Sequence, residues 1–191
     1  MKRSEINGAI ATAKSAFCAT GWALPPEPRW DVTDFGLGDF SREGLTLVNL
    51  AEEKEYCEKL MFTALNQATP LHTHKRKKED IICRAGELII ELWDGDPTVV
   101  EKGLPATLHR NGKPFAYRNG DLLTLRAGER VTLESGNYHS FWAGTPEGCV
   151  VGEVSTANDD TCDNFFVNTN VGRYPEIDED EAPVVKLVSD K

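Results

Sequence analysis

The stretch PLHTHKRKKEDI, residues 70–81, places two histidines one residue apart, followed by four cations and a glutamate. In a strand, residues i and i+2 project from the same face, so His72 and His74 are expected to point the same way. Glu79 lies five positions after His74, an odd offset that in a continuing strand would send it to the opposite face. A run of four cations resists burial. We therefore predict that residues 75–78 form a solvent-exposed turn and that Glu79 begins the next strand, facing inward.

Short β-prone segments surround this stretch from Gly44 onward, separated by turn signals. Their spacing, roughly ten residues, is typical of an antiparallel sandwich or barrel. Asn111-Gly112 is a strong signal for a two-residue hairpin. No helical period of comparable length interrupts the run, which disfavours an α/β fold. We predict an all-β barrel within one domain, with residues 1–40 as a helical addition and wrapping loop and residues 41–191 as the β domain.

The two ends of the chain have their own patterns. Residues 4–20 carry apolar side chains at helical spacing, with Ser4 as a candidate N-cap and Gly21 as a candidate end. Residues 24–44 are rich in Pro, Gly and Asp, which predicts an irregular loop wrapping the core. The tail, residues 177–191, has an acidic cluster and then an apolar patch; it packs at an edge or subunit contact, or it is solvated.

Composition excludes several classes of protein. The 191 residues carry a formal net charge of −10, and a field of that sign repels phosphate backbones, so we expect no nucleic-acid partner. No apolar run reaches the roughly 18 residues of a membrane span, and the first residues lack the apolar core of a signal peptide. The five cysteines are an odd number without a CxxC, which predicts free thiols. We expect a cytoplasmic protein with no membrane partner.

An HxH pair alone is also consistent with surface or hydrogen-bonded histidines. The longer spacing, HxH, four residues, Glu79, six residues and Gly86, resembles the first motif of the cupin superfamily, a jelly-roll β-barrel. The family's second motif supplies a third histidine, and His139 in GNYHSFW takes that position, although a core histidine would fit the same apolar strand. Asn66 and Arg126 stand where the family has glycine and proline. The ligand set that this resemblance implies is His72, His74, Glu79 and His139.

Three imidazoles and one carboxylate suit Mn, Fe, Co or Ni with two positions open to substrate. Four segments taken in order, YCEKLMF, PLHTHKRKKEDI, GEVSTANDDTCDNFF and GRYPEIDEDE, resemble the D-lyxose ketol-isomerases over about residues 30–182. The resemblance implies an aldose–ketose isomerase that uses Mn²⁺, with Co²⁺ as another possible ion. It also implies action on D-lyxose and D-xylulose, related activity on D-mannose and D-fructose, and a homodimer.

Aldose–ketose interconversion moves a proton between C1 and C2, most simply through a cis-enediol, and needs a base beside that carbon. Glu153, in the apolar run CVVGEVST, is the candidate base if its strand position faces the interior. Burial would then raise its pKa; on the outer face it would be a surface acid. Lys59 in YCEKLMF either binds a sugar hydroxyl and assists proton transfer, or is an edge lysine that reaches solvent.

The remaining candidate residues lie further along the chain. Asp163 is a candidate partner acid, with Asp159 and Asp160 as competitors that could instead cap a turn. Three residues are candidates for sugar binding: Asn164, Arg173, which could equally form a structural ion pair, and Phe141, which could equally be core. Two rival functions use the same ligands: an Fe(II)-dependent cupin dioxygenase and a non-catalytic sugar-binding cupin.

Overall fold

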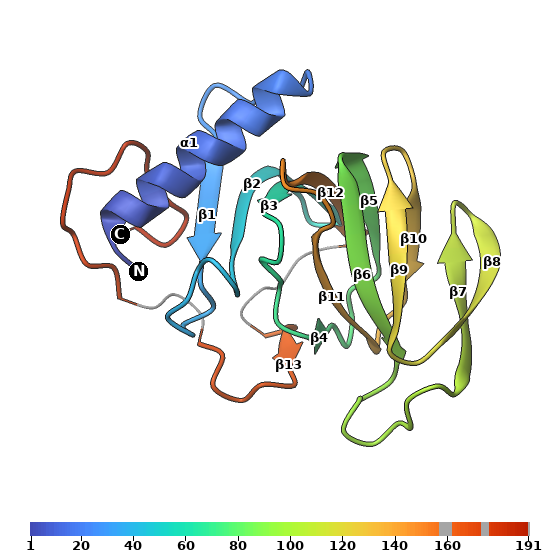
Figure 1. Ribbon diagram of the computed structural model, residues 1–191. Coiled ribbons are helices and arrows are strands. Elements are labelled where there is room, and N and C mark those ends of the chain that lie inside the picture. Colours follow the sequence, from blue (N-terminus) through green and yellow to red (C-terminus); the bar gives the residue numbers. More distant parts are fainter. Residues whose placement is uncertain (157–161, 173–175, 191) are drawn as a thin grey trace.

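The computed structural model describes residues 1–156, 162–172 and 176–190. One helix, α1 (Arg3–Ala19), precedes the strands (Figure 1). The strands are β1 (Arg29–Thr33), β2 (Leu45–Glu52), β3 (Tyr56–Thr63), β4 (His72–Thr73), β5 (Glu79–Ala85), β6 (Glu87–Asp94), β7 (Pro105–Arg110), β8 (Lys113–Arg118), β9 (Asp121–Arg126), β10 (Arg130–Leu133), β11 (Asn137–Ala143), β12 (Cys149–Thr156) and β13 (Phe165–Phe166).

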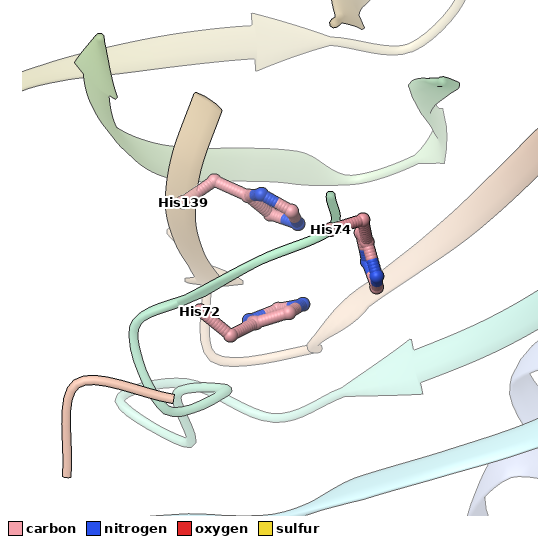
Figure 2. Close-up of side chains that lie close together, drawn as sticks. All are labelled: His72, His74 and His139. Atoms are coloured by element: carbon pink, nitrogen blue, oxygen red, sulfur yellow. The ribbon is translucent and has the colours of Figure 1, made fainter. Parts of the chain in front are cut away.

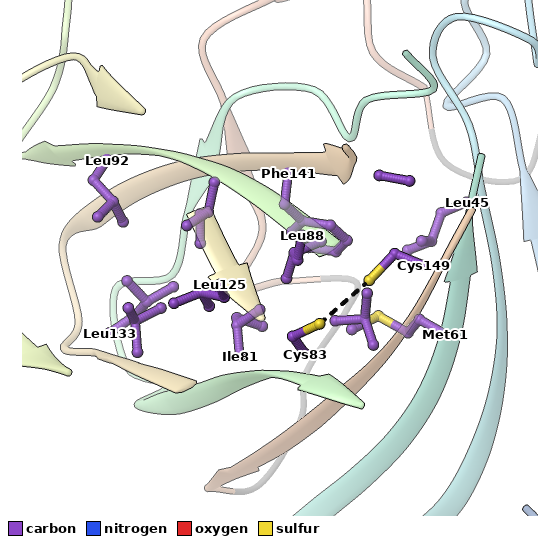
Figure 3. Close-up of a cluster of buried hydrophobic side chains, with 14 of the residues drawn as sticks. Leu45, Met61, Ile81, Cys83, Leu88, Leu92, Leu125, Leu133, Phe141 and Cys149 are labelled. Atoms are coloured by element: carbon purple, nitrogen blue, oxygen red, sulfur yellow. Dashed lines mark hydrogen bonds between the residues drawn. The ribbon is translucent and has the colours of Figure 1, made fainter. Parts of the chain in front are cut away.

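The strands form two antiparallel sheets. The eight-stranded sheet has the order β1-β2-β3-β12-β5-β10-β7-β8, and the five-stranded sheet has the order β13-β4-β11-β6-β9. Period-two alternation turns one face of each sheet inward, and the buried side chains between them form the main core (Figure 3), which includes Met61, Ile81, Leu88, Leu125 and Phe141. The all-β, cupin-type jelly-roll predicted from the sequence is confirmed.

The outer faces of β1, β2 and β3 are covered by α1 (Figure 1). The apolar face of the helix, which includes Ile6, Ile10 and Phe17, packs with Trp30 and Leu60 into a second core. The helix was predicted within one residue at each end, but the predicted cap is wrong. Lys2 is the N-cap residue, and its own side chain makes no capping hydrogen bond. The carboxylate of Asp180 accepts the backbone N–H of Ser4 at 2.9 Å. The Ser4 hydroxyl instead donates to Asp180.

The segment predicted as an irregular loop, residues 24–44, contains strand β1, which pairs with β2 from Arg29↔Asn49 to Thr33↔Leu45. Alternation divides this strand between two environments: Trp30 and Val32 face the helix, while Asp31 and Thr33 face the barrel interior. Proline and glycine on both sides of RWDVT conceal this alternation in the sequence.

The tail packs against the domain, in agreement with the packed alternative and not with the solvated one. Leu187 is buried in the helix-side core and forms a bridge to Trp30. The Arg3 guanidinium is buried and pairs with Glu179 at 2.7 Å and Asp190 at 2.9 Å. Residues near both ends of the chain therefore close the helix-covered side of the barrel together.

Two local predictions are confirmed. Asn111 and Gly112 join β7 to β8 with positive φ values of 53° and 76°, as a type I′ hairpin turn requires. All five cysteines are free, and the Sγ atoms of Cys83 and Cys149 lie 3.7 Å apart in the main core (Figure 3). Among the described residues, no helix combines the length and apolar character that crossing a membrane requires.

Candidate active site

Three histidines meet inside the barrel (Figure 2). His72 on β4 pairs directly with His139 on β11, and His74 follows β4 by one residue. One ring nitrogen from each imidazole can be chosen so that all three lie within 4.8 Å of one another. The prediction that His72 and His74 point to the same side is therefore confirmed. Strand β11 brings the imidazole of His139 to the same place.

Backbone carbonyls orient two of the rings. The Nδ1 of His72 lies 2.8 Å from the carbonyl oxygen of Pro70, and the Nδ1 of His74 lies 2.8 Å from that of Asp163. Because a carbonyl only accepts, each Nδ1 carries the proton and each Nε2 presents a lone pair, as in metal-ligating histidines. Burial holds the pKa of His72 well below its ordinary value and lowers the pKa of His139 to about 4. Both rings are neutral at pH 7, which is the form that binds a cation.

Glu79, the first residue of β5, joins this cluster. Its Oε1 lies 3.5 Å from Nε2 of His74 and 3.2 Å from Nε2 of His139. This oxygen is buried and has no hydrogen-bond partner within the described part of the chain. A buried carboxylate oxygen without a donor, beside neutral imidazole nitrogens, fits a cation held among them. The four residues expected as ligands thus offer a suitable donor set for a divalent metal.

The cationic turn departs from prediction at one position. Lys75, Arg76 and Lys78 are exposed, but Lys77 is only 4% exposed. Its Nζ lies 2.7 Å from Oε2 of Glu79 and 2.9 Å from Oε1 of Glu153. Burial opposes its charge, but the two carboxylates raise the pKa of Lys77 above its ordinary value. The attraction between the Lys77 ammonium group and two buried carboxylates outweighs the cost of removing this group from solvent.

Glu153 and Lys59 are paired residues of β12 and β3. Each is 5% exposed, and Lys59 Nζ lies 3.6 Å from Oε1 of Glu153. The interior position predicted for Glu153 is confirmed, and the alternative of Lys59 as an edge lysine is wrong. The expected rise in pKa is also wrong: burial acts to raise the pKa of Glu153, but Lys59 and Lys77 outweigh it, and the net shift is downward.

Asp163 does not present its carboxylate as a partner acid. The carboxylate accepts the backbone N–H groups of Lys75, Arg76 and Lys77 at 3.0–3.2 Å. Burial acts to raise the pKa of Asp163, but these N–H groups hold it below its ordinary value. Since its carbonyl also binds His74, Asp163 fixes the turn that carries Lys77 and orients one histidine.

One pocket contains these groups. The lining residues that the sequence predicted are Lys59, His72, His74, Glu79, His139, Phe141, Glu153 and Asn164. Phe141 also belongs to the main core. Arg173, Asp159 and Asp160 lie outside the described residues.

Several lining residues were missed by sequence reasoning. Besides Lys77, they include Asp31, Thr33 and Phe35, which follow one another at every second position from β1 into the next loop. The alternation RWDVTDF is the signal that could have found them.

A jelly-roll barrel with a three-histidine cluster and buried lysine–glutamate pairs in one interior pocket is an arrangement suited to an enzyme active site. The chain belongs to the D-lyxose isomerase family, whose model matches residues 27–191. The resemblance inferred from the sequence is thus confirmed.

Three similar proteins illustrate this relationship. The D-lyxose/D-mannose isomerase of Escherichia coli O157:H7 is 37% identical, over 100% of this chain and 98% of its own. That of Serratia proteamaculans is 43% identical, over 81% of this chain and 72% of its own. Among solved structures, the L-ribose isomerase of Geodermatophilus obscurus superposes with a TM-score of 0.66 at 18% identity, covering 90% of this chain and 94% of its own, a likeness of fold.

Proposed function

We propose that this protein is a metal-dependent aldose–ketose isomerase that converts D-lyxose to D-xylulose, with D-mannose and D-fructose as a second pair. One observation carries the proposal: a buried carboxylate, Glu153, lies between two lysines in the same pocket as the histidine cluster. The names of the relatives support the sugars chosen.

His72, His74, His139 and Glu79 would hold the metal. The mixed nitrogen and oxygen donor set suits Mn, Fe, Co or Ni. The family resemblance leads us to choose Mn²⁺, with Co²⁺ and other divalent ions as alternatives. When bound, such an ion polarises the sugar carbonyl and stabilises negative charge on the sugar oxygens.

Glu153 is the base in this proposal. Lys59 and Lys77 keep it ionised at neutral pH, so it can remove the proton from C2 of the aldose and return it to C1 by way of a cis-enediol. Lys59 donates a hydrogen bond to a sugar oxygen and assists the accompanying proton transfer there. Lys77 couples Glu153 to Glu79 and fixes the distance between the base and the histidine cluster.

The other residues bind or position. Asn164 and Arg173 bind sugar hydroxyls, and Phe141 contributes an apolar surface for the sugar carbons. Asp163 holds the turn that carries Lys77. We include a homodimer and a cytoplasmic location in the proposal on the basis of the family resemblance; light scattering of the purified protein tests the dimer.

The decisive experiment is a screen of aldopentoses and aldohexoses for ketose formation. Metal-stripped protein is reloaded separately with Mn²⁺, Co²⁺, Ni²⁺ and Fe²⁺, and D-xylulose and D-fructose are measured by chromatography. We expect the highest kcat/KM with D-lyxose and Mn²⁺. No turnover of any sugar with Mn²⁺ or Co²⁺ would refute the isomerase proposal, and Fe²⁺-dependent oxygen uptake would point to the dioxygenase alternative.

A further inference from the structure

Phe35 lies in the loop after β1 and lines the pocket without belonging to the charged cluster. Its backbone has a positive φ of 54°. This left-handed conformation is unfavourable for a residue with a bulky side chain. Such backbone strain persists only where the surrounding structure imposes it. Here it occurs at a residue whose aromatic ring lines the pocket.

The loop has its own supports. The Phe35 N–H donates to the Thr33 hydroxyl at 2.8 Å. The buried carboxylate of Asp34 accepts the N–H groups of Gly36 at 2.9 Å and Gly38 at 3.2 Å. These hydrogen bonds hold the turn without involving the aromatic side chain of Phe35.

A second segment meets this loop from the opposite sheet. The Gly172 N–H donates to the Phe35 carbonyl at 2.8 Å. A Cβ on Gly36 would lie 3.2 Å from Gly172 backbone atoms, so the two segments are in close contact. The ring of Phe35 meets that of Phe166 on β13 edge-to-face, with centroids 6.0 Å apart. The ring of Phe166 in turn lies 5.5 Å from that of His72.

Phe35 and Phe166, here called the aromatic wall, therefore bridge the two edge strands β1 and β13 beside the histidine cluster. Met61, Ile81 and Phe141 of the main core also line the pocket, and Phe35 packs against this core. A sugar whose reacting carbons lie between the histidines and Glu153 would have its other end within reach of the wall, which adjoins His72.

We propose that Phe35 determines the length of sugar that the pocket accepts, by contacting the end of the chain remote from the reacting carbons. This inference rests on the proposed function and deepens it. Truncating the ring opens space for the additional hydroxymethyl group of an aldohexose. A difference of one carbon group in a shaped pocket changes kcat/KM by roughly 10- to 200-fold.

The experiment compares Phe35→Ala and Phe35→Leu with wild type, using D-lyxose and D-mannose and the metal-loaded protein. We expect the ratio of kcat/KM for mannose over lyxose to rise at least about tenfold in Phe35→Ala, and less in Phe35→Leu. Phe115→Ala is the matched control: Phe115 is also half-buried against the main core but does not line the pocket. Its ratio should match wild type.

Calorimetric binding of D-arabinitol and D-mannitol, the five- and six-carbon polyols, separates this inference from the proposed function. If no aldose is isomerised but Phe35→Ala shifts polyol preference toward mannitol, the isomerase proposal fails and the role of Phe35 stands. A ratio that stays within twofold of wild type in both Phe35 variants overturns the inference. Failure of the wild-type protein to bind either polyol or turn over either sugar overturns it as well.

Discussion

Replacing Lys77 with methionine tests whether the lysine between the two carboxylates is an electrostatic requirement of the site. Methionine keeps the length of the aliphatic chain and removes the ammonium group, whose Nζ lies 2.7 Å from Glu79 and 2.9 Å from Glu153. Both carboxylates are buried. The substitution therefore leaves Glu79 without its cation and Glu153 with Lys59 alone, at 3.6 Å.

The expected loss follows from that burial. Breaking a buried ion pair by removing one partner typically costs about 3–5 kcal/mol, because the remaining charge is desolvated without compensation. The neighbouring Lys78 supplies a matched control. It pairs with Glu134 at 2.6 Å, but both side chains are more than half exposed. Such a surface pair contributes about 0–1 kcal/mol, so Lys78→Met should be close to wild type.

Urea unfolding of the metal-free protein at pH 7, followed by tryptophan fluorescence, measures both variants. Metal-free protein is used so that no bound cation neutralises Glu79. Adding Glu79→Gln to Lys77→Met should recover part of the loss, because the carboxylate left without a cation disappears. If the two lysine variants differ by less than about 1 kcal/mol in free energy of unfolding, the buried-ion interpretation of Lys77 is refuted.

Three further predictions concern the base, the metal and the tail. Glu153→Gln should lower kcat by roughly 10²- to 10⁴-fold while atomic absorption finds an unchanged metal content; unchanged turnover would remove Glu153 from the role of base. His139→Ala should weaken Mn²⁺ binding at least about tenfold by calorimetry, and equal affinity would exclude this residue as a ligand. Burial opposes ionisation of Asp190, but its bond to Arg3 holds its pKa below the ordinary value. Asp190→Asn should therefore cost roughly 1 kcal/mol at neutral pH. This difference from wild type should shrink as pH falls through the lowered pKa, and a difference that stays constant with falling pH would contradict the prediction.

The sequence was sufficient for the barrel and for the histidines because both depend on local period. Alternation and hairpin chemistry predict antiparallel strands, and HxH on a strand predicts two imidazoles on one face. The partners of these residues come from elsewhere. His72 lies opposite His139 because β4 pairs with β11. The spacing does not contain this pairing, and the family resemblance implied only that His139 belongs to the ligand set.

The errors have a common physical cause. Lys77 was assigned to solvent with its neighbours because a run of cations normally is, yet carboxylates on two other strands draw this one inside. Glu153 was expected to have a raised pKa because only its burial could be anticipated, whereas two lysines reverse the sign. Asp163 was predicted to be a partner acid because its sequence neighbours do not reveal that its carboxylate accepts backbone N–H groups from the turn at residues 75–77. Each depends on long-range contacts that no local pattern contains.

The meeting of Phe35 with Gly172 and of Arg3 with Asp190 also has a consequence for folding. Arg3 and Asp190 are 187 positions apart. Nearly the whole chain must therefore lose conformational freedom before their contact can form and stabilise the fold. We therefore expect slow folding, with the wall of the pocket completed only as the final segments dock. A sugar that binds the finished pocket should then slow unfolding and leave the folding rate nearly unchanged.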